Sequence, residues 1–595
     1  NEVFNTRDPF YLSQTTPVRA GVALRFSLLL HEDCHCCEGW LILRREGEDA
    51  RWIPLCHAGT QDRFQRWECT AAPERAGLYW YRFEYEGNWR RNVVTRVDEC
   101  RGDVTPDGAD WQLTVTEPDY AVPEGYAGGL IYQIFPDRFF ASGSPKENVP
   151  ADRYLCADWS AQPAWRQKDG PRSLGNDYYG GDLKGITEKL DYLQSLGVTI
   201  LYLNPIFEAH SNHRYNTADY TRVDPLLGTE EDFAALCREA KARGMAVILD
   251  GVFSHTGADS RYYNKYGRYP DTGAYQSKAS PYYPWFSFYD WPEGCHSWWG
   301  VPSLPEVNEE EPSYLDFICG ENGVLRRWMR LGASGWRLDV ADELPDGFLD
   351  RVREAVKAEN PDALLLGEVW EDASIKVSHG GRRRFLLGRQ VDSVMNYPWR
   401  TAILDFVRGG AARDLRLAVE ELIAHYPKGA VDLLMNHIGT HDTERVLSLL
   451  GGAPLDLDRA AQAEVRLTPA QRQEGLRRLK LAAVLQYTLP GLPSLYYGDE
   501  AGVEGLRDPF NRTGYPWGQE DADLLAFYRK LGAIRKHPAF AGGDFLPVWE
   551  SETALVFDRV KGKRRVRVAV NRGKEPVPLP DGTILPAEDY AIQLD

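Results

Sequence analysis

Eight apolar, strand-like runs alternate with amphipathic segments between residues 130 and 538, and this alternation restricts the fold more than any other feature. The runs lie at 130–135, 199–203, 245–250, 335–340, 363–369, 392–396, 432–436 and 493–498. Between them lie segments with a helical apolar period, such as 183–197 and 229–244. Eight β–α repeats predict an α/β protein with a closed (β/α)8 barrel, although a doubly wound sheet has a similar pattern.

The regions on either side of this repeat have the texture of β-structure. Short runs rich in β-branched and aromatic residues, broken by Gly, Pro and Asp, predict an N-terminal β-sandwich at 1–117. A Pro/Gly-rich linker at 117–129 leads into a barrel domain at 128–538, and a small C-terminal β domain is expected at 539–595. The barrel contains an insertion after its third strand, at about 255–315, which is far longer than an ordinary βα loop.

The insertion is unusually aromatic. It holds 14 aromatic residues among the 39 from Arg261 to Trp299, whereas the whole chain is 12% aromatic. A small core explains about half of them, and we expect several of the others to form a binding wall. The expected wall includes Trp285, Phe286, Trp291, Trp298 and Trp299 among others.

Charge and cysteine content narrow the classes of partner. The net charge of −18 disfavours nucleic acid and anionic membranes, and no apolar run reaches the ~18–20 residues of a membrane span. Ten cysteines in a chain of this length indicate free thiols in a reducing, cytoplasmic compartment, and no signal-peptide pattern is present at the N-terminus. The stretch from His31 to Gly39 has CxCC spacing, so a loop with spare thiols is favoured over a zinc site.

Acidic residues follow several of the predicted barrel strands. Asp250, Asp339, Glu368 and the pair His441–Asp442 end or closely follow the third, fourth, fifth and seventh strands. Barrel enzymes carry their catalytic groups at these strand ends, and neighbouring acids raise one another's pKa. One protonated and one ionised carboxyl group is the combination that glycoside hydrolysis requires, whereas a single acid here could be a structural cap.

At this point the sequence resembles the α-amylase family of glycoside hydrolases. The resemblance covers about 130–538, and its motifs occur in the family's order. They are IYQIFPDRF (131–139), YYGGDLKGI (178–186), HRYNTADY (213–220), DGVFSH (250–255), LPEVN (304–308), GWRLDVADE (335–343), GEVW (367–370), NHIGTHDTER (436–445) and YYGDEAGVEGLRDPFNR (496–512). The preceding sandwich resembles that of the cyclomaltodextrinase, neopullulanase and maltogenic amylase branch.

The resemblance implies a role for each matching residue. Asp339 would be the nucleophile, Glu368 the general acid/base and Asp442 the third carboxylate, with Arg337 keeping Asp339 ionised. The other positions implied to contact substrate include three histidines expected at the cleavage subsite, a tyrosine expected to stack under the sugar, and an Asp–Arg pair expected to grip the next sugar. These positions are His255, His441, His213, Tyr215, Asp250, Asn308, Trp370, Glu371, Asp508 and Arg512.

Departures from the family pattern concern metal and linkage. Ser254 replaces an Asn that ligates calcium in many relatives, and Ser142 and Ser144 deplete a second calcium loop near Asn148 and Asp182. We therefore expect no required cofactor, with Ca²⁺ at Asn148 and Asp182 as the weaker alternative. Glu371 stands where the branch often has His and could alter linkage preference or transfer to sugar acceptors.

The resulting interpretation is a retaining hydrolase of α-1,4-glucosidic bonds, with some α-1,6 cleavage, acting on malto-oligosaccharides, cyclodextrins, pullulan or starch. An α-1,6 debranching enzyme or an α-glucanotransferase remains open, because the same intermediate serves water and sugar acceptors. A non-catalytic binding subunit is disfavoured by the presence of all three carboxylates. The branch also implies a homodimer whose N-terminal domain narrows the partner's active-site mouth and selects short or cyclic substrates.

Overall fold

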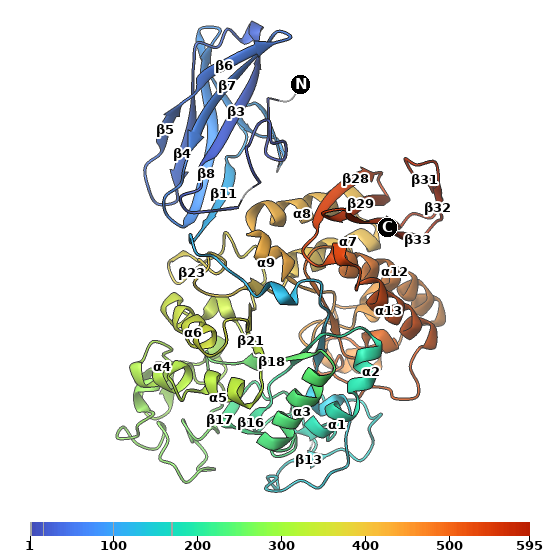
Figure 1. The fold of residues 1–595 in the computed structure, drawn as a ribbon. Coiled ribbons are helices and arrows are strands. Elements are labelled where there is room, and N and C mark those ends of the chain that lie inside the picture. The colour runs from blue at the N-terminus through green and yellow to red at the C-terminus, as the bar shows by residue number, and fades with distance from the viewer. Residues whose placement is uncertain (1–2, 16, 99, 168–169) are drawn as a thin grey trace. The chain divides into compact units, whose positions relative to one another are not determined.

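The computed structural model describes residues 3–15, 17–98, 100–167 and 170–595 (Figure 1). Contacts between Cα atoms divide the chain into two compact units. One contains residues 1–122, 372–392 and 416–431, and the other contains residues 123–371, 393–415 and 432–595. The first unit therefore takes up two segments that lie within the barrel's stretch of sequence. The predicted boundaries at 117, 128 and 539 stay predictions.

Eight parallel strands form the barrel expected from the sequence. Their order is β25-β22-β21-β18-β15-β12-β27-β26, and a parallel bridge between Met395 and Met435 joins the two outer members. The strands are β12 (Ile131–Ile134), β15 (Ile200–Leu203), β18 (Ala246–Gly251), β21 (Gly335–Leu338), β22 (Leu364–Gly367), β25 (Ser393–Val394), β26 (Met435–His437) and β27 (Leu492–Tyr496). Each predicted run overlaps one of them, which confirms the barrel.

The barrel strands are buried on both faces, as expected when helices cover a parallel sheet. All residues of β12, β15, β21 and β22 are buried. The helices of the chain are α1 (Leu183–Glu188), α2 (Leu190–Ser195), α3 (Glu230–Ala242), α4 (Pro312–Cys319), α5 (Val324–Leu331), α6 (Asp346–Glu359), α7 (Tyr397–Arg408), α8 (Ala412–His425), α9 (Lys428–Asp432), α10 (Val446–Leu450), α11 (Arg459–Glu464), α12 (Pro469–Thr488) and α13 (Ala522–Ile534). The predicted helix at 183–197 is two short helices that meet at Lys189.

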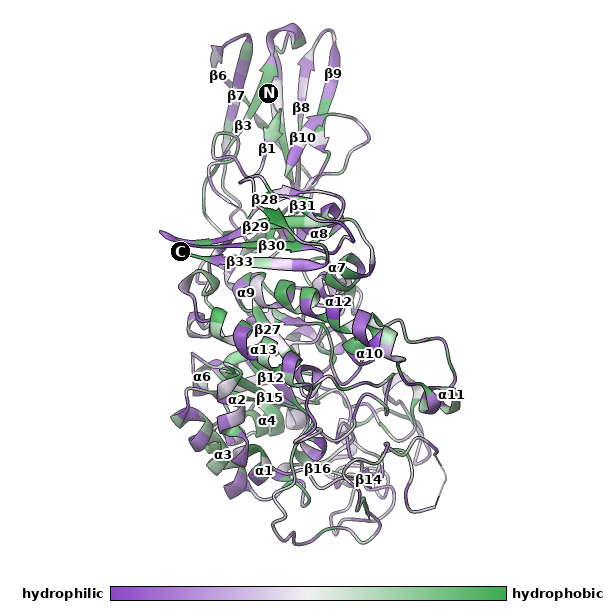
Figure 2. Ribbon diagram, turned by 90° about the vertical axis from the view of Figure 1, so that its right-hand side faces the viewer, coloured by the Kyte–Doolittle hydropathy of each residue, from purple (hydrophilic) through white to green (hydrophobic). Residues whose placement is uncertain are grey.

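Local sequence explains where the barrel helices begin. Thr229 and Asp232 form a reciprocal capping box at the start of α3, and Thr468 and Gln471 form another at the start of α12. Each box satisfies two backbone N–H groups that the first helical turn leaves unpaired. In Figure 2, α3 carries both hydrophobic and hydrophilic residues, as a helix does when one of its faces covers a sheet.

The N-terminal region forms two sheets around one core, and all their strand pairs are antiparallel except the parallel pair of β2 and β11. The larger sheet runs β1-β10-β9-β8-β11-β2, with β4 paired to β8 and β5 paired to β4, and the smaller runs β3-β7-β6. Its strands are β1 (Phe4–Asn5), β2 (Val18–Arg19), β3 (Leu24–His31), β4 (Glu38–Arg45), β5 (Arg51–Pro54), β6 (Cys56–Gln61), β7 (Phe64–Ala71), β8 (Gly77–Gly87), β9 (Arg90–Arg96), β10 (Arg101–Val104) and β11 (Trp111–Thr116). Phe26 of β3 and Phe83 of β8 are fully buried between the sheets. This arrangement matches the predicted sandwich.

The chain ends in a four-stranded antiparallel sheet, β28-β29-β30-β33, with a hairpin of β31 and β32. The strands are β28 (Asp544–Glu550), β29 (Ala554–Lys561), β30 (Arg564–Asn571), β31 (Val577–Pro578), β32 (Ile584–Leu585) and β33 (Asp589–Leu594). Figure 2 shows hydrophobic residues along β29 and β30, which are largely buried. Small strands elsewhere are β13 (Tyr154–Leu155), β14 (Asp177–Tyr178), β16 (Phe207–Ala209), β17 (Thr217–Val223), β19 (Phe288–Asp290), β20 (Gly294–Cys295), β23 (Val377–Ser378) and β24 (Gly381–Arg382).

Across the described ranges, no helix combines the length and apolar character that a bilayer span requires.

Candidate active site

Three acidic side chains and one arginine meet at the carboxyl ends of three adjacent strands. Asp250 belongs to β18, Arg337 to β21, and Glu368 directly follows β22. The register pairs Asp250 with Arg337 across β18 and β21, and Leu338 with Gly367 across β21 and β22. Because side chains at paired positions of parallel strands lie side by side, the register brings the residues around Asp339 together at one end of the barrel.

The Arg337 guanidinium is the centre of this cluster. Its Nη1 donates to Asp250 Oδ1 and to Asp339 Oδ1, both at 2.8 Å, and its Nη2 forms an ion pair with Glu368 Oε2 at 2.7 Å. Arg337 is fully buried. Three carboxyl groups therefore share one positive charge away from water. Repulsion between buried like charges at this distance makes it costly to ionise all three groups at once.

Electrostatics reinforce this interpretation. Burial raises the pKa of Asp339 well above its ordinary value, and Glu368 and Asp250 raise it further, while Arg337 acts in the opposite direction. Burial also raises the pKa of Asp250 and that of Asp442, and Arg337 opposes both shifts. Several carboxyl groups with raised pKa values beside one guanidinium are typical of a site for acid–base chemistry.

Two hydrogen bonds orient the carboxyl group of Glu368. The backbone N–H of Val340 donates to Oε2 at 2.8 Å, and the indole N–H of Trp370 donates to Oε1 at 3.0 Å. Val340 has φ of 41° and ψ of 48°, a left-handed conformation that β-branched residues rarely adopt. Trp370 in turn stacks on Tyr397, with ring centroids 4.0 Å apart. The turn after Asp339 and the residue after Val369 thus fix the direction of Glu368.

A second wall of the site is built around Arg512. Its Nε and Nη2 donate to the carbonyl oxygen of His441 at 3.0 and 2.9 Å, and its Nη1 contacts Asp508 Oδ1 at 2.9 Å. Asp442 lies between them, 3.6 Å from Arg512 Nη2 and 3.2 Å from His441 Nε2. Asp508 is exposed whereas Arg512 is buried, so Asp508 is the member of the pair that a ligand can reach.

Tyr215 connects the two walls. Its hydroxyl donates to Asp250 Oδ2 at 2.6 Å, and its ring stacks on His441 with centroids 5.2 Å apart and an interplanar angle of 4°. His213 accepts the Tyr215 backbone N–H at its Nδ1 and stacks beside the same ring. Burial lowers the pKa of His213 to about 4, so it is neutral at physiological pH. The predicted site residues Tyr215, His213 and His441 are therefore assembled together.

His255 differs from the sequence expectation. Its Nδ1 lies 2.9 Å from Ser254 Oγ and its Nε2 lies 2.9 Å from the carbonyl oxygen of Tyr215. Burial lowers its pKa to about 4, so the neutral ring donates from Nε2 to Tyr215 and accepts at Nδ1. Both nitrogens are used within the protein. In this arrangement His255 secures the Tyr215 backbone and presents no N–H to a sugar hydroxyl.

Comparison with known proteins agrees with this geometry. Residues 133–520 match the model of the alpha amylase catalytic domain, which is more than half of the chain. The chain belongs to the α-amylase family. The predicted membership, the barrel with its flanking β domains, and the expectation of a glycosidase family are thereby confirmed.

Individual relatives of this family member cover it to different extents. An amylopullulanase of Thermoanaerobacter thermohydrosulfuricus is 35% identical over 94% of the chain, but the match spans only 40% of that protein. A cyclomaltodextrinase of Geobacillus thermopakistaniensis is 33% identical over 90% of the chain and 85% of its own length. Among solved structures, the type III pullulan hydrolase from Thermococcus kodakarensis has a TM-score of 0.69 at 29% identity, with full coverage of both chains. The chain thus spans less than half the length of the amylopullulanases it matches.

The predicted aromatic wall of this α-amylase family member is only partly a surface. Trp285 and Phe286 are 3% and 5% exposed and fill the core of the insertion, so their assignment to the wall was wrong. Trp291 is half-buried, with its indole N–H on the carbonyl of Ala274. Trp299, by contrast, is 79% exposed. The burial pattern follows from the insertion's need for its own core, which aromatic content alone does not reveal.

Glu343 is a functional candidate that the sequence analysis missed. Its Oε2 accepts the indole N–H of Trp298 at 2.7 Å and its Oε1 accepts that of Trp299 at 2.8 Å. Trp298 also lies against His255, with ring centroids 5.2 Å apart. Glu343 therefore anchors the half-buried Trp298 and the exposed Trp299 to the turn after Asp339. Its position four residues after Asp339, within the quoted GWRLDVADE motif, was the available signal.

The remaining predicted contact residues lie on exposed loops. Asn308 is exposed, and its Oδ1 accepts the backbone N–H of Glu310 at 3.3 Å. Glu371 is also exposed, three residues after Glu368. Trp370 is 48% exposed beside Glu368. The roles implied for Asn308, Trp370 and Glu371 stay predictions.

The calcium positions implied by the family are occupied by protein groups. Asp182 caps α1 through the Gly185 N–H, accepts from Ser142 and forms an ion pair with the Lys146 ammonium. A cation beside Asp182 would meet that ammonium, and Asn148 lies exposed on the loop. Ser254, in the other position, is engaged with His255. The described residues contain no group of three His, Cys, Asp or Glu side chains placed to hold a metal ion. These donors do not fit Ca²⁺.

The cysteine-rich stretch forms a short turn and strand start. Residues Glu32–Cys34 make a 3₁₀ turn before β4, and all ten cysteines of the chain are free thiols. Burial raises the pKa of the Cys36 thiol to about 12, and Cys37 and Cys34 raise it further. Burial therefore disfavours the reactive thiolate form of Cys36. The stretch matches the predicted loop with spare thiols.

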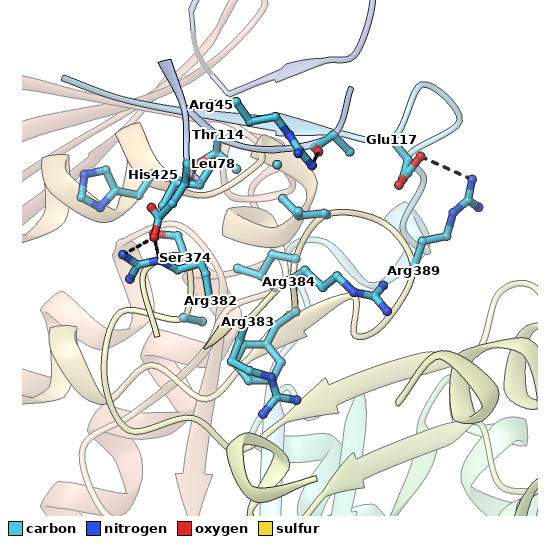
Figure 3. A pocket seen from close by; sticks show the side chains of 17 residues that line it. Arg45, Leu78, Thr114, Glu117, Ser374, Arg382, Arg383, Arg384, Arg389 and His425 are labelled. Carbon is cyan, nitrogen blue, oxygen red and sulfur yellow. Dashed lines mark hydrogen bonds and ion pairs between the residues drawn. The ribbon is translucent and has the colours of Figure 1, made fainter. Parts of the chain in front are cut away.

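A cavity of about 410 Å³ lies in the unit that contains the sandwich (Figure 3). Five arginines line it, and several are bound by carboxylates of the same unit. Arg382 pairs with Glu46 at 2.9 Å, and Arg389 pairs with Asp119 at 2.9 Å and with Glu117 at 3.7 Å. These pairs join the 372–392 segment to β4 and to the strand end after β11, which explains why the segment belongs to this unit.

Proposed function

We propose that this chain is a retaining glycosidase that hydrolyses α-1,4-glucosidic bonds, and some α-1,6 bonds, in malto-oligosaccharides, cyclodextrins and pullulan. The observation that carries the proposal is the Arg337 guanidinium, which binds Asp339 through Nη1 and Glu368 through Nη2. Retaining enzymes need two carboxyl groups only ~5–5.5 Å apart, and two neighbouring nitrogens of one planar guanidinium are a suitable template. The names of the relatives supply the substrate class.

In the first step, Asp339 attacks the anomeric carbon while Glu368 gives its proton to the leaving oxygen. The bond between the anomeric carbon and that oxygen breaks, and an ester between the sugar and Asp339 forms. The ion pair with Arg337 favours the carboxylate form of Asp339, which is the form that attacks, and Glu368 carries the proton that is transferred. Val340 and Trp370 hold the Glu368 oxygens in place, so little reorganisation is needed when the proton moves.

In the second step, Glu368 removes a proton from water and the water oxygen attacks the same carbon. The ester to Asp339 breaks, and the sugar leaves with its original configuration. Asp442 and His441 would hold ring hydroxyls of the sugar at the cleavage point, with Tyr215 stacked beneath it and Asp508 with Arg512 contacting the next sugar. Entry of a sugar hydroxyl in place of water gives transfer, the nearest alternative outcome.

A product assay on β-cyclodextrin, pullulan and starch in parallel tests this function. We expect new reducing ends from all three substrates. NMR of the first products should show that the configuration at the anomeric carbon is retained. Cleavage of only α-1,6 bonds in pullulan would replace the proposal with a debranching enzyme. Absence of products from every substrate, in a protein that binds β-cyclodextrin, would indicate a binding subunit instead.

We also propose selection of short or cyclic substrates by a homodimer. The support is the exposed Trp299, held by Glu343 beside Trp298, and the resemblance to a branch in which the N-terminal domain narrows the mouth. An aromatic mouth stacks on short rings better than it admits long branched chains. Catalytic efficiency on β-cyclodextrin should exceed that on amylopectin, and light scattering should give twice the 67.4 kDa of one chain. A monomer that prefers amylopectin contradicts both parts.

Finally, we propose that catalysis requires no metal and that the protein works in a reducing, cytoplasmic compartment. The Lys146–Asp182 pair and the Ser254–His255 contact support the first part, and ten free thiols support the second. Thiol-reactive labelling of the protein isolated under non-reducing conditions should modify the exposed Cys37 and Cys56. Disulfides in that material would contradict the proposed compartment.

A further inference from the structure

A continuous chain of polar side-chain contacts leads from Asp250 to Asp442. The Tyr215 hydroxyl donates to Asp250 Oδ2 at 2.6 Å, and Asn204 Nδ2 donates to that hydroxyl at 2.8 Å. Gln133 Nε2 donates to Asn204 Oδ1 at 3.1 Å and lies 2.8 Å from His441 Nδ1. Neither Gln133 nor Asn204 has a role in the chemistry described above.

The direction of each bond in this chain follows from its acidic end. Asp250 receives Tyr215, a second tyrosine hydroxyl from Tyr202 and the Arg337 guanidinium, so its oxygens act as acceptors. The Tyr215 hydroxyl has one proton, which it donates to Asp250, so it must accept a hydrogen bond from the amide of Asn204. The carbonyl oxygen of Asn204 therefore faces Gln133.

Gln133 then fixes the state of the imidazole. An amide nitrogen has two protons and no acceptor site, so Gln133 Nε2 donates one proton to Asn204 Oδ1 and the other to His441 Nδ1. A ring nitrogen that accepts carries no proton. His441 must therefore carry its proton on Nε2, which is the nitrogen 3.2 Å from Asp442 Oδ2.

We propose that Gln133 and Asn204 are positioning residues that hold His441 as a neutral imidazole protonated at Nε2, aimed at Asp442 and the sugar being cleaved. This inference rests on the proposed function for its catalytic consequence, but the protonation state itself is a property of the free protein. The opposite tautomer would direct an unprotonated nitrogen at the Asp442 carboxylate and would present no donor to the sugar.

The surroundings keep the ring in this state and orientation. Gln133 is fully buried, and Asn204 and His441 are each 1% exposed. The Tyr215 ring stacks on the imidazole, and Arg512 holds the His441 carbonyl. Burial, Arg512 and Arg337 lower the pKa of His441 well below its ordinary value, whereas Glu368 and Asp508 act in the opposite direction. A neutral donor suits this place, because an imidazolium would repel the positive charge that develops on the sugar.

The observed orientation of the Gln133 amide leaves one buried oxygen, Oε1, without a hydrogen bond among the described residues. Turning the amide around would give Oε1 no better site, since it would then face Asn204 Oδ1, and it would remove the donor to His441. The two bonds made by Nε2 must therefore outweigh one unsatisfied buried oxygen.

Long-range proton–nitrogen NMR of the whole chain labelled with ¹⁵N-histidine tests the proposal directly, because the two neutral tautomers and the imidazolium give different nitrogen shifts. The His441 signals are assigned by their loss in His441→Gln. We expect the Nε2-protonated pattern, unchanged from pH 5 to pH 8. A pattern with the proton on Nδ1, or a titration within that range, would overturn the proposal whatever the enzyme's activity proves to be.

Two variants extend the test. Gln133→Glu replaces the donor with an acceptor, so His441 should take its proton on Nδ1, and kcat should fall about 10²-fold with a much smaller change in KM. Gln486→Glu is the matched control, because Gln486 is equally buried but donates to the backbone carbonyls of Asn436 and Ser494. It should leave the His441 pattern unchanged. A Gln133→Glu protein that folds and keeps the Nε2-protonated pattern would show that Gln133 has only a structural role.

Discussion

Two buried charge clusters in the barrel unit have opposite compositions. Around Arg337, three carboxyl groups share one guanidinium. Around Asp224, one carboxylate receives two guanidinium groups, with Arg153 at 2.7 Å and Arg214 at 3.1 Å. Burial would raise the pKa of Asp224, but Arg214 and Arg153 outweigh it and the pKa is lowered. At Asp339 the excess of acid leaves the pKa raised. The acid-rich cluster thus favours protonation of a carboxyl group, whereas the base-rich cluster favours its ionisation.

The largest effect should come from neutralising the acid-rich cluster. Asp339→Asn and Glu368→Gln should each lower turnover by about 10⁴-fold or more, because each removes a group that makes or breaks a bond. Thermal unfolding should change little, since removing one of three crowded acids relieves repulsion. Initial rates on β-cyclodextrin and circular dichroism measure the two effects. Activity within tenfold of the unmodified enzyme would refute the assigned roles.

The base-rich cluster should behave in the reverse way. Asp224→Asn leaves two buried guanidinium groups without their carboxylate and should lower the free energy of unfolding by about 3–5 kcal/mol. Turnover per folded molecule should stay close to that of the unmodified enzyme, because Asp224 is not among the residues that bind the Arg337 cluster. Urea unfolding and active-site titration separate the two quantities. If stability is retained while turnover falls, the contrast between the clusters fails.

Glu500 offers an intermediate case with one buried acid and neutral partners. Burial raises its pKa to about 7, although the hydroxyls of Tyr132 and Tyr192 donate to it and act in the opposite direction. The folded protein keeps this proton between pH 4.5 and 7, where the unfolded chain releases it. Stability should therefore fall as pH rises through this range, by about 3 kcal/mol from this group.

Glu500→Gln should remove that part of the pH dependence. Urea unfolding of both proteins at pH 5 and pH 7 measures the difference. Glu504→Gln serves as the control, because Glu504 is a nearby, half-buried carboxyl group that pairs with Arg472 at 2.6 Å. A pH slope that is identical in Glu500→Gln and the unmodified protein would show that this carboxyl group is ionised throughout.

The smallest effect is expected from chelation. The Lys146 ammonium neutralises the Asp182 carboxylate, as the guanidinium groups do for Asp224, so this carboxylate has no excess negative charge to attract a cation. Dialysis against EDTA should leave both the initial rate and the thermal midpoint unchanged. A loss of activity that calcium restores would show that Asp182 or Ser254 contributes to a calcium site.

Periodic features of the sequence predicted most of the fold. Each of the eight apolar runs became a barrel strand because burial on both faces demands a continuous apolar segment. Lys189 breaks one predicted helix, and no composition signal marks that break. The grouping of 372–392 with the sandwich depends on ion pairs such as Arg382–Glu46, which join residues 336 positions apart. Pairings at such a distance leave no trace in local periodicity.

The sequence predicted those site residues whose role follows from the type of side chain, such as a carboxylate or a guanidinium. Asp339, Glu368 and Arg337 come together because their strands are neighbours in register. The role of His255 could not be predicted, since it depends on which acceptor each ring nitrogen meets. Gln133 lies in a quoted motif, but only its two hydrogen bonds reveal what its amide does.

The backbone conformation of Val340 affects stability and catalysis in opposite directions. A valine in a left-handed conformation costs stability, and the same conformation aims its N–H at Glu368. Selection for heat resistance alone would favour glycine there, which adopts φ of 41° without strain but also adopts many other conformations. Such a protein would survive higher temperatures while losing control over its proton donor. A thermostability screen scored by survival, without an activity measurement, is therefore expected to accumulate changes at this position at the expense of catalysis.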